Sequence, residues 1–152
     1  HKNWLINFKS EWSTITSNSQ NFNQRNFRIK SFSWNPAVSY LLTKQSRVSI
    51  FFERAQKENQ IQEKESLKQN NLGLSFAFSN LDKFSFNGEL KYIDNTFSGS
   101  PFSPVAYQML EGLQPNKNLT WNLLAQKRVT KFLDLNVSYF GRASATSKTI
   151  HT

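Results

Sequence analysis

The sequence predicts an all-β protein, an antiparallel transmembrane β-barrel of the outer-membrane type, of which about seven strands are visible. Apolar and polar residues alternate along segments of about ten residues or longer, which gives a strand one apolar and one polar face. Very short turns alternate with long polar loops as the connections between these segments, as in a meander barrel. No run approaches the roughly 18 apolar residues of a transmembrane helix.

The composition favours such a barrel over a packed soluble core. Hydrophobic residues make up only 38% of the 152 residues and mean hydropathy is -0.59, yet 14 residues are Phe. A membrane barrel needs apolar residues only on the outward half of each strand. The chain has no Cys, which excludes disulfides and thiolate metal sites.

The first two predicted strands cover residues 3–14 and 27–41, and a polar loop at 17–21 lies between them. The second strand contains Pro36, which has no N–H to donate to a β-ladder. We therefore expect a bulge or a locally unpaired position at this proline.

The third and fourth strands are predicted at 47–53 and 72–79, after a short turn at 43–45. The stretch 54–69 between them is rich in Lys, Glu and Gln with nearly balanced charge. We expect a solvated loop there, with a helical turn as the alternative.

A tight turn at 80–83 leads into the fifth strand at 84–92. A long loop at 95–117, which carries three of the four prolines, then precedes the sixth strand at 119–128. Glycines within the predicted strands are expected to mark bends or close packing.

The seventh strand, 132–146, follows a turn at Thr130–Lys131 and shows the alternation most clearly. Leu133 and Val137 share a parity with the other apolar residues, and Ser138 has the opposite parity with the polar ones. Two-faced alternation of this kind is typical of a strand between lipid and a polar interior.

The asymmetry of the connections predicts an orientation. Short turns follow even-numbered strands and lie in the periplasm, whereas long loops follow odd-numbered strands and lie outside. With this orientation the seventh strand runs toward the outside. A barrel of even strand number therefore needs at least one more strand. We expect residues 1–152 to be a single segment of a larger barrel, incomplete at both ends.

The alternation assigns candidate residues to both faces. Those expected to meet lipid or to form aromatic girdles are Trp12, Trp34, Tyr40, Leu74, Phe76, Phe86, Tyr92, Trp121, Leu135 and Tyr139. Those expected to face the lumen are Lys9, Glu11, Glu53, Glu89, Lys91, Arg128, Asp134 and Arg142. The lumen residues either pair across neighbouring strands and fill the interior, or line a pore and set its selectivity.

The net charge of +9, from 19 Lys and Arg against 10 Asp and Glu, bears on partners. The cations are dispersed through turns and loops, with clusters at the short turns, so we expect no nucleic-acid partner. Anionic lipid head groups are the expected counter-charge.

Residues for catalysis or metal binding are not grouped in the sequence. The only histidines are His1 and His151, and no carboxylates lie near either at ligand spacing. The five glycines form no phosphate-binding loop. We therefore expect no enzyme activity, no catalytic residue, no cofactor and no metal.

The segment Tyr107–Thr152 resembles a known class of proteins. The residues that carry this resemblance are Leu110-Glu111-Gly112-Leu113-Gln114-Pro115, Asn118-Leu119-Thr120-Trp121, Leu133-Asp134-Leu135-Asn136-Val137-Ser138-Tyr139, Gly141-Arg142 and Ile150-His151-Thr152. They resemble the carboxy-terminal end of large Bacteroidota outer-membrane β-barrel proteins. The resemblance implies location in the outer membrane of a Gram-negative bacterium and other envelope subunits as partners. It carries over no catalytic residue.

Three functions fit these observations. The first is a barrel subunit or anchor of a larger envelope complex for transport, secretion or protein assembly. The second is a substrate-conducting outer-membrane pore. The third is a soluble β-rich glycan-binding module with exposed Trp side chains as stacking platforms.

Overall fold

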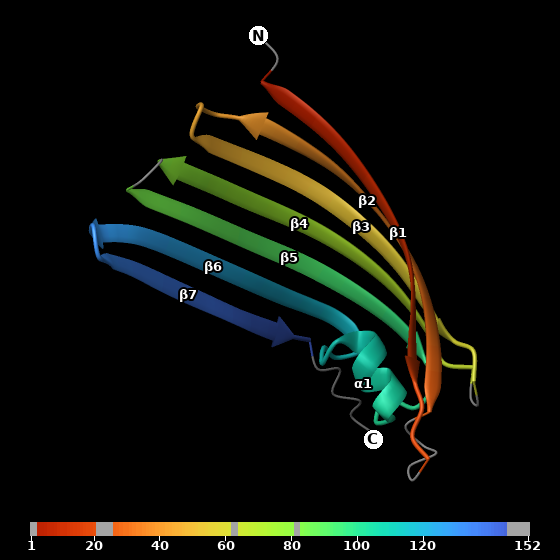
Figure 1. The fold of residues 1–152 in the computed structure, drawn as a ribbon. Coiled ribbons are helices and arrows are strands. Elements are labelled where there is room, and N and C mark those ends of the chain that lie inside the picture. The colour runs from red at the N-terminus through yellow and green to blue at the C-terminus, as the bar shows by residue number, and fades with distance from the viewer. Residues whose placement is uncertain (1–2, 21–25, 62–63, 81–82, 146–152) are drawn as a thin grey trace, which may run out of the picture.

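The computed structural model describes residues 3–20, 26–61, 64–80 and 83–145. Seven antiparallel strands form one sheet in the order of the chain, β1 to β7, and the sheet is not closed (Figure 1). The elements are β1 (Trp4–Ser17), β2 (Phe27–Leu41), β3 (Ser46–Asn59), β4 (Ser66–Asn80), β5 (Phe84–Ser98), α1 (Pro104–Leu110), β6 (Asn116–Thr130) and β7 (Leu133–Ser144). The predicted all-β class, the seven strands and their meander order are confirmed.

The prediction of a solvated loop at 54–69 is wrong for most of its length. β3 continues to Asn59 and β4 already begins at Ser66, with Ala55 paired to Gln69. In this part of the strands the apolar side chains change face: Ala55 and Leu67 are buried, whereas Arg54 on the opposite face is exposed. Because the outer face turns polar there, the stretch looks like a loop in the sequence.

The region 95–117 is also more ordered than predicted, because it contains the helix α1. Ser103 caps the helix: its Oγ accepts a hydrogen bond from the backbone N–H of Ala106 at 3.0 Å. Pro104 occupies the first turn, where a missing N–H costs nothing. The helix ends at Glu111, whose φ of 55° is left-handed. In the described part of the chain no helix has the length and apolar character to cross a membrane.

Pro36 interrupts one of the two ladders of β2. It pairs with Phe8 of β1, but the β2–β3 register lacks pairs at Asn35 and Pro36 and resumes at Ala37 with Phe51. The register is the same on both sides of the gap, so the chain is locally unpaired without a bulge. This was one of the two predicted outcomes.

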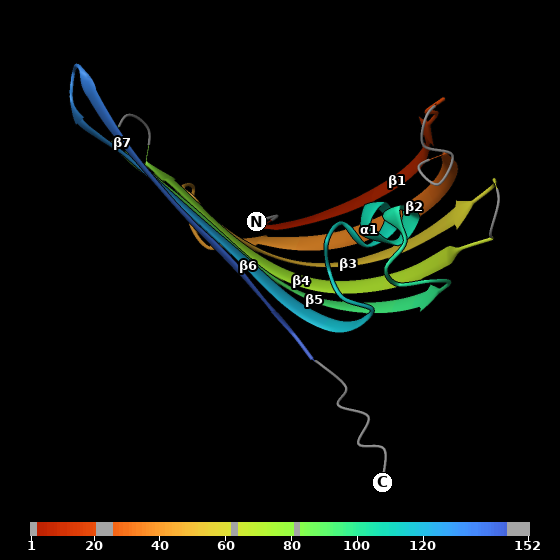
Figure 2. The ribbon, with the colours of Figure 1, turned by 90° about the horizontal axis from the view of Figure 1, so that it is seen from below.

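The buried core lies between α1 and one face of the sheet at the long-loop end. The sheet curves, and α1 lies on its concave side (Figure 2). The core residues are Ile29, Leu67, Val105, Ala106, Met109 and Leu110, with Phe27 and Phe97 packed against them. The face of the sheet that carries Ile29 and Leu67 is therefore the concave face.

Candidate functional site

The strand register divides the sheet into two faces, because residues paired across neighbouring strands point to the same side. One unbroken row crosses all seven strands on the convex face: Ile6, Val38, Ile50, Leu74, Leu90, Trp121 and Gly141. No polar residue interrupts it. Ile6 is 78% exposed and Ile50, on a central strand, is 56% exposed, so this apolar surface is uncovered within the chain.

We call this surface the convex belt. On β5 it runs from Phe84 to Tyr92, about the 9–11 residues that a tilted strand uses to cross a bilayer. All ten residues predicted to face outward lie on the convex face: Trp12, Trp34, Tyr40, Leu74, Phe76, Phe86, Tyr92, Trp121, Leu135 and Tyr139.

The register also gives each belt residue a position along the sheet, relative to its neighbours, that the sequence could not. Trp34 aligns with Arg54 at the loop-side border of the belt. Tyr92 lies at the same border, two residues before Asp94, and Leu135 pairs with Lys127 at the turn-side border. Only part of the predicted girdle set therefore lies at a border, since Trp121 belongs to the middle row.

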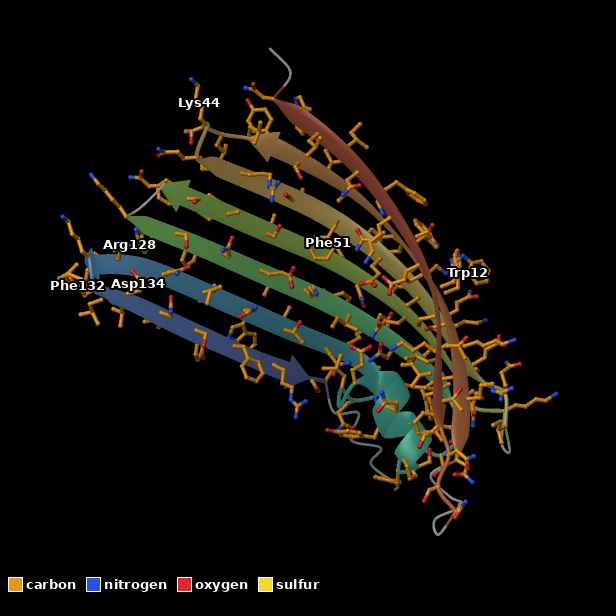
Figure 3. All side chains as sticks on the ribbon, in the orientation of Figure 1. Trp12, Lys44, Phe51, Arg128, Phe132 and Asp134 are labelled. Carbon is orange, nitrogen blue, oxygen red and sulfur yellow. The ribbon has the colours of Figure 1, made fainter. Side chains whose placement is uncertain are left out.

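Aromatic contacts join neighbouring strands along the belt. The ring centroids of Trp12 and Phe32 are 4.4 Å apart, and those of Trp4 and Tyr40 are 4.7 Å apart, with tilted planes. Figure 3 shows Trp12 projecting from β1 away from the rest of the sheet. Such pairs contribute beyond their buried area and hold the edge strand β1 to β2.

The concave face carries the polar side chains. All eight residues predicted to face inward lie on it: Lys9, Glu11, Glu53, Glu89, Lys91, Arg128, Asp134 and Arg142. It is not uniformly polar, because Phe51, Leu124 and Phe140 share it.

The ion pairs on this face run along strands as well as across them. Lys9 Nζ lies 2.7 Å from Glu11 Oε2, and Lys91 Nζ lies 2.9 Å from Glu89 Oε1 within the same strand. Arg128 Nε lies 3.2 Å from Asp134 Oδ1 across β6 and β7, at the turn end of the sheet (Figure 3). These ion pairs partly neutralise the charges of the concave face. Two of them form within one strand and one forms across neighbouring strands.

A hollow of about 470 Å³ lies on the concave face between the sheet and the segment that carries α1. Its polar lining includes Glu11, Glu53, Lys57, Gln69, Asn71 and Gln108. Asn71 Nδ2 donates to Glu53 Oε2 at 3.1 Å. Apolar side chains, among them Ile29 and Ile93, share this inner surface with the hydroxyl, amide and charged groups.

Lys57 was not among the predicted inward residues, and it anchors α1 to β3. Its Nζ donates to the carbonyl of Met109 at 2.9 Å and lies 2.6 Å from Glu111 Oε1, and its side chain is only 14% exposed. Arg142 of β7 donates from Nη1 to the carbonyl of Gly112 at 2.8 Å. No sequence signal pointed to Lys57, because it lies in the stretch interpreted as a loop.

Buried asparagines hold the chain that leaves α1, and sequence reasoning missed them too. Asn95 and Asn118 both donate from Nδ2 to the carbonyl of Gln114, at 3.2 and 2.9 Å. Gln69 Nε2 donates to Asn95 Oδ1 at 2.9 Å. The alternation in the sequence could have revealed them, since these polar residues continue the inward-facing positions of the strands beyond their predicted ends.

Two of the strand glycines lie under aromatic rings of the neighbouring strand. The ring of Phe51 covers Gly73 and the indole of Trp121 covers Gly141, and each ring belongs to the residue paired with that glycine. A Cβ at either glycine would overlap the ring. The close packing expected of strand glycines is confirmed at these two positions.

His1 and His151 lie outside the described residues. Among the residues that are described, no three His, Asp or Glu side chains are placed to hold a metal ion. Compared with protein-family models, curated proteins and solved structures, the chain matches none of them. The resemblance to Bacteroidota barrel proteins stays a prediction.

Proposed function

We propose that this chain forms part of the wall of an outer-membrane β-barrel in a Gram-negative bacterium, as a subunit or anchor of a larger envelope complex. The observation that carries the proposal is the convex belt, whose middle row crosses all seven strands without a charged residue, opposite a largely polar concave face. Lipid outside and a polar interior are the two environments that suit these faces.

The energetics of the belt support a lipid neighbour. Monomeric soluble proteins rarely expose contiguous apolar patches larger than a few hundred Å². Removing one large apolar side chain from water contributes about 1.5–3 kcal/mol, and every strand of the sheet contributes several such side chains to the belt. Lipid tails would cover all of them without any further protein layer.

The position of α1 supports an anchor over an open conduit. The helix packs on the concave face and is tied to β3 by Lys57 and, through the segment after it, to β7 by Arg142. The interior of the barrel is narrower where it holds a fixed helix than where the sheet alone lines it. The conducting pore is therefore the second proposal.

The soluble glycan-binding module receives less support. Trp12 is 79% exposed, but it lies within the belt together with Trp34 and Trp121. The indole of Trp121 lies over Gly141 instead of standing free as a stacking platform. A soluble module would also leave the belt in contact with water.

Extraction of the full-length polypeptide tests the barrel proposal. We expect it to stay with the outer-membrane fraction through high-salt and alkaline washes, to require detergent for release, and to resist unfolding by sodium dodecyl sulfate at room temperature. Release into the soluble fraction on cell lysis, without detergent, would contradict the proposal.

Conductance in planar bilayers separates anchor from pore. We expect the purified full-length protein to insert and to give no stable channel steps. Regular steps from inserted protein would favour the conducting pore over the anchor.

A further inference from the structure

The convex face changes character at the long-loop end, just beyond the belt. Five exposed cations of β2, β3, β4 and β6 lie there, and we call them the basic stripe: Arg28, Lys30, Arg54, Lys68 and Lys117. One register row joins Arg54, Asn70, Asp94 and Lys117 directly. Residues that are far apart in the sequence are thus brought side by side on one face.

No ion pair between described residues neutralises the cations of the stripe. Among the residues that the structure describes, the same region of the convex face carries only two carboxylates, Glu58 and Asp94. Lys30 lies opposite Glu58 and Lys117 opposite Asp94, yet within the described residues neither lysine forms an ion pair. The stripe therefore presents a net positive charge to whatever lies outside this face.

The stripe begins at the level expected for lipid head groups and extends from there toward the long loops. Arg54 follows Phe52, the last belt residue of β3, by two positions, or about 7 Å along the strand. Lys and Arg extend their stems along apolar surface and keep the charge at the polar boundary. Trp34, which aligns with Arg54, adds a side chain type that favours the same boundary.

We propose that the basic stripe binds the phosphate groups of anionic lipids in the leaflet at the long-loop end of the barrel. This inference rests on the proposed barrel function. Guanidinium groups hold phosphate through paired hydrogen bonds and lysines act as point charges. A nucleic acid would need the same charges, but it would leave the adjoining belt without a partner. A lipid satisfies the stripe with its head group and the belt with its tails.

The test uses the detergent-solubilised full-length protein and two short-chain lipids of equal chain length, phosphatidic acid and phosphatidylcholine. Binding is followed by native mass spectrometry. The stripe variant carries Arg28→Gln, Arg54→Gln and Lys68→Gln. A charge-retaining variant carries Arg28→Lys, Arg54→Lys and Lys68→Arg. A third variant removes the same charge at the short turns through Lys44→Gln, Lys83→Gln and Lys131→Gln.

We expect the stripe variant to lose at least about tenfold in affinity for phosphatidic acid, since each cation near a lipid surface contributes appreciably. Phosphatidylcholine binding should change little. The charge-retaining variant should keep most of the affinity, and the short-turn variant should lose clearly less than the stripe variant.

Three results would overturn the inference. Equal losses in the stripe and short-turn variants would mean that net charge alone governs binding. Displacement of the lipid by inorganic phosphate at equal concentration, or by a single-stranded oligonucleotide, would assign the stripe to another anion. Failure of the wild-type protein to require detergent would instead contradict the barrel proposal, so the two failures are distinguishable.

Discussion

At the scale of single residues, parity along a strand decides which environment a side chain meets. Leu74 lies in the middle row of the convex belt, and Ser75, its neighbour in sequence, lies on the concave face. Leu135 is also on the belt, but it pairs with Lys127 near the turn end. Three substitutions to arginine therefore probe both the face and the height of a residue.

We expect Leu74→Arg to lower the free energy of unfolding in lipid vesicles by about 2–4 kcal/mol, the cost of arginine near mid-bilayer on a lipid face. Ser75→Arg should cost much less, and Leu135→Arg should fall between them because it lies closer to the head groups. Denaturant titration of the reconstituted full-length protein measures all three. Equal tolerance at Leu74 and Ser75 would show that the convex face does not meet lipid.

A second prediction concerns the ring of Phe51 over Gly73. We expect Gly73→Val to destabilise the protein by about 1–3 kcal/mol, because the new side chain must displace the ring from a packed position. Combining it with Phe51→Ala should recover part of that loss, and the double-mutant cycle measures the coupling. Strictly additive losses would mean that the ring and the glycine do not act together.

At the scale of elements, α1 depends on contacts with strands that are distant in sequence. Its apolar side packs on Ile29 and Leu67, and Lys57 neutralises Glu111 and binds the carbonyl of Met109 at the end of the helix. The helix has seven residues, too few to be stable alone in water. Tertiary contacts therefore maintain it.

We expect Lys57→Met to loosen α1 while leaving the sheet intact, since it leaves the carbonyl of Met109 without this donor and removes the ion pair between the largely buried Lys57 and the exposed Glu111. Amide hydrogen exchange over 104–113 should accelerate by at least about tenfold, with the β4 amides unchanged. Lys44→Met, in the exposed turn between β2 and β3, is the matched control. Unchanged exchange in α1 would show that Lys57 does not hold the helix.

Much of each element could be predicted from the sequence, and the errors have one cause. Strand number, strand order and the turns at 43–45 and 130–131 follow from the alternation of apolar and polar residues. This alternation arises because each face of a strand meets a different environment. The loop-side halves of β3 and β4 were missed because their apolar residues change to the concave face, where α1 covers them. Without knowledge of α1, a polar outer face is indistinguishable from a solvated loop.

At the scale of the whole molecule, the two edges of the sheet constrain its surroundings. Seven antiparallel strands in sequence order make β1 and β7 run in the same direction. Antiparallel closure of the sheet therefore requires an odd number of further strands between these edges. Long, uncovered edge strands also invite pairing with other strands.

We expect hydrogen exchange of the membrane-embedded full-length protein to show β1 and β7 protected as strongly as the central strand β4, because a barrel leaves no free edge. Residue-level exchange by nuclear magnetic resonance or mass spectrometry measures this. Fast exchange of alternate amides along β1 or β7 would show that the sheet remains open in the membrane.

The sequence by itself determined the two-faced strands, their order and the residues on each face, because a strand's period of two makes facing a local property. Only the tertiary structure decided the height of each residue on the sheet, the ordering of α1 on the concave face and the assembly of the basic stripe. These depend on register, which pairs residues dozens of positions apart. The same cations that are dispersed along the chain therefore become one surface when the strands are aligned.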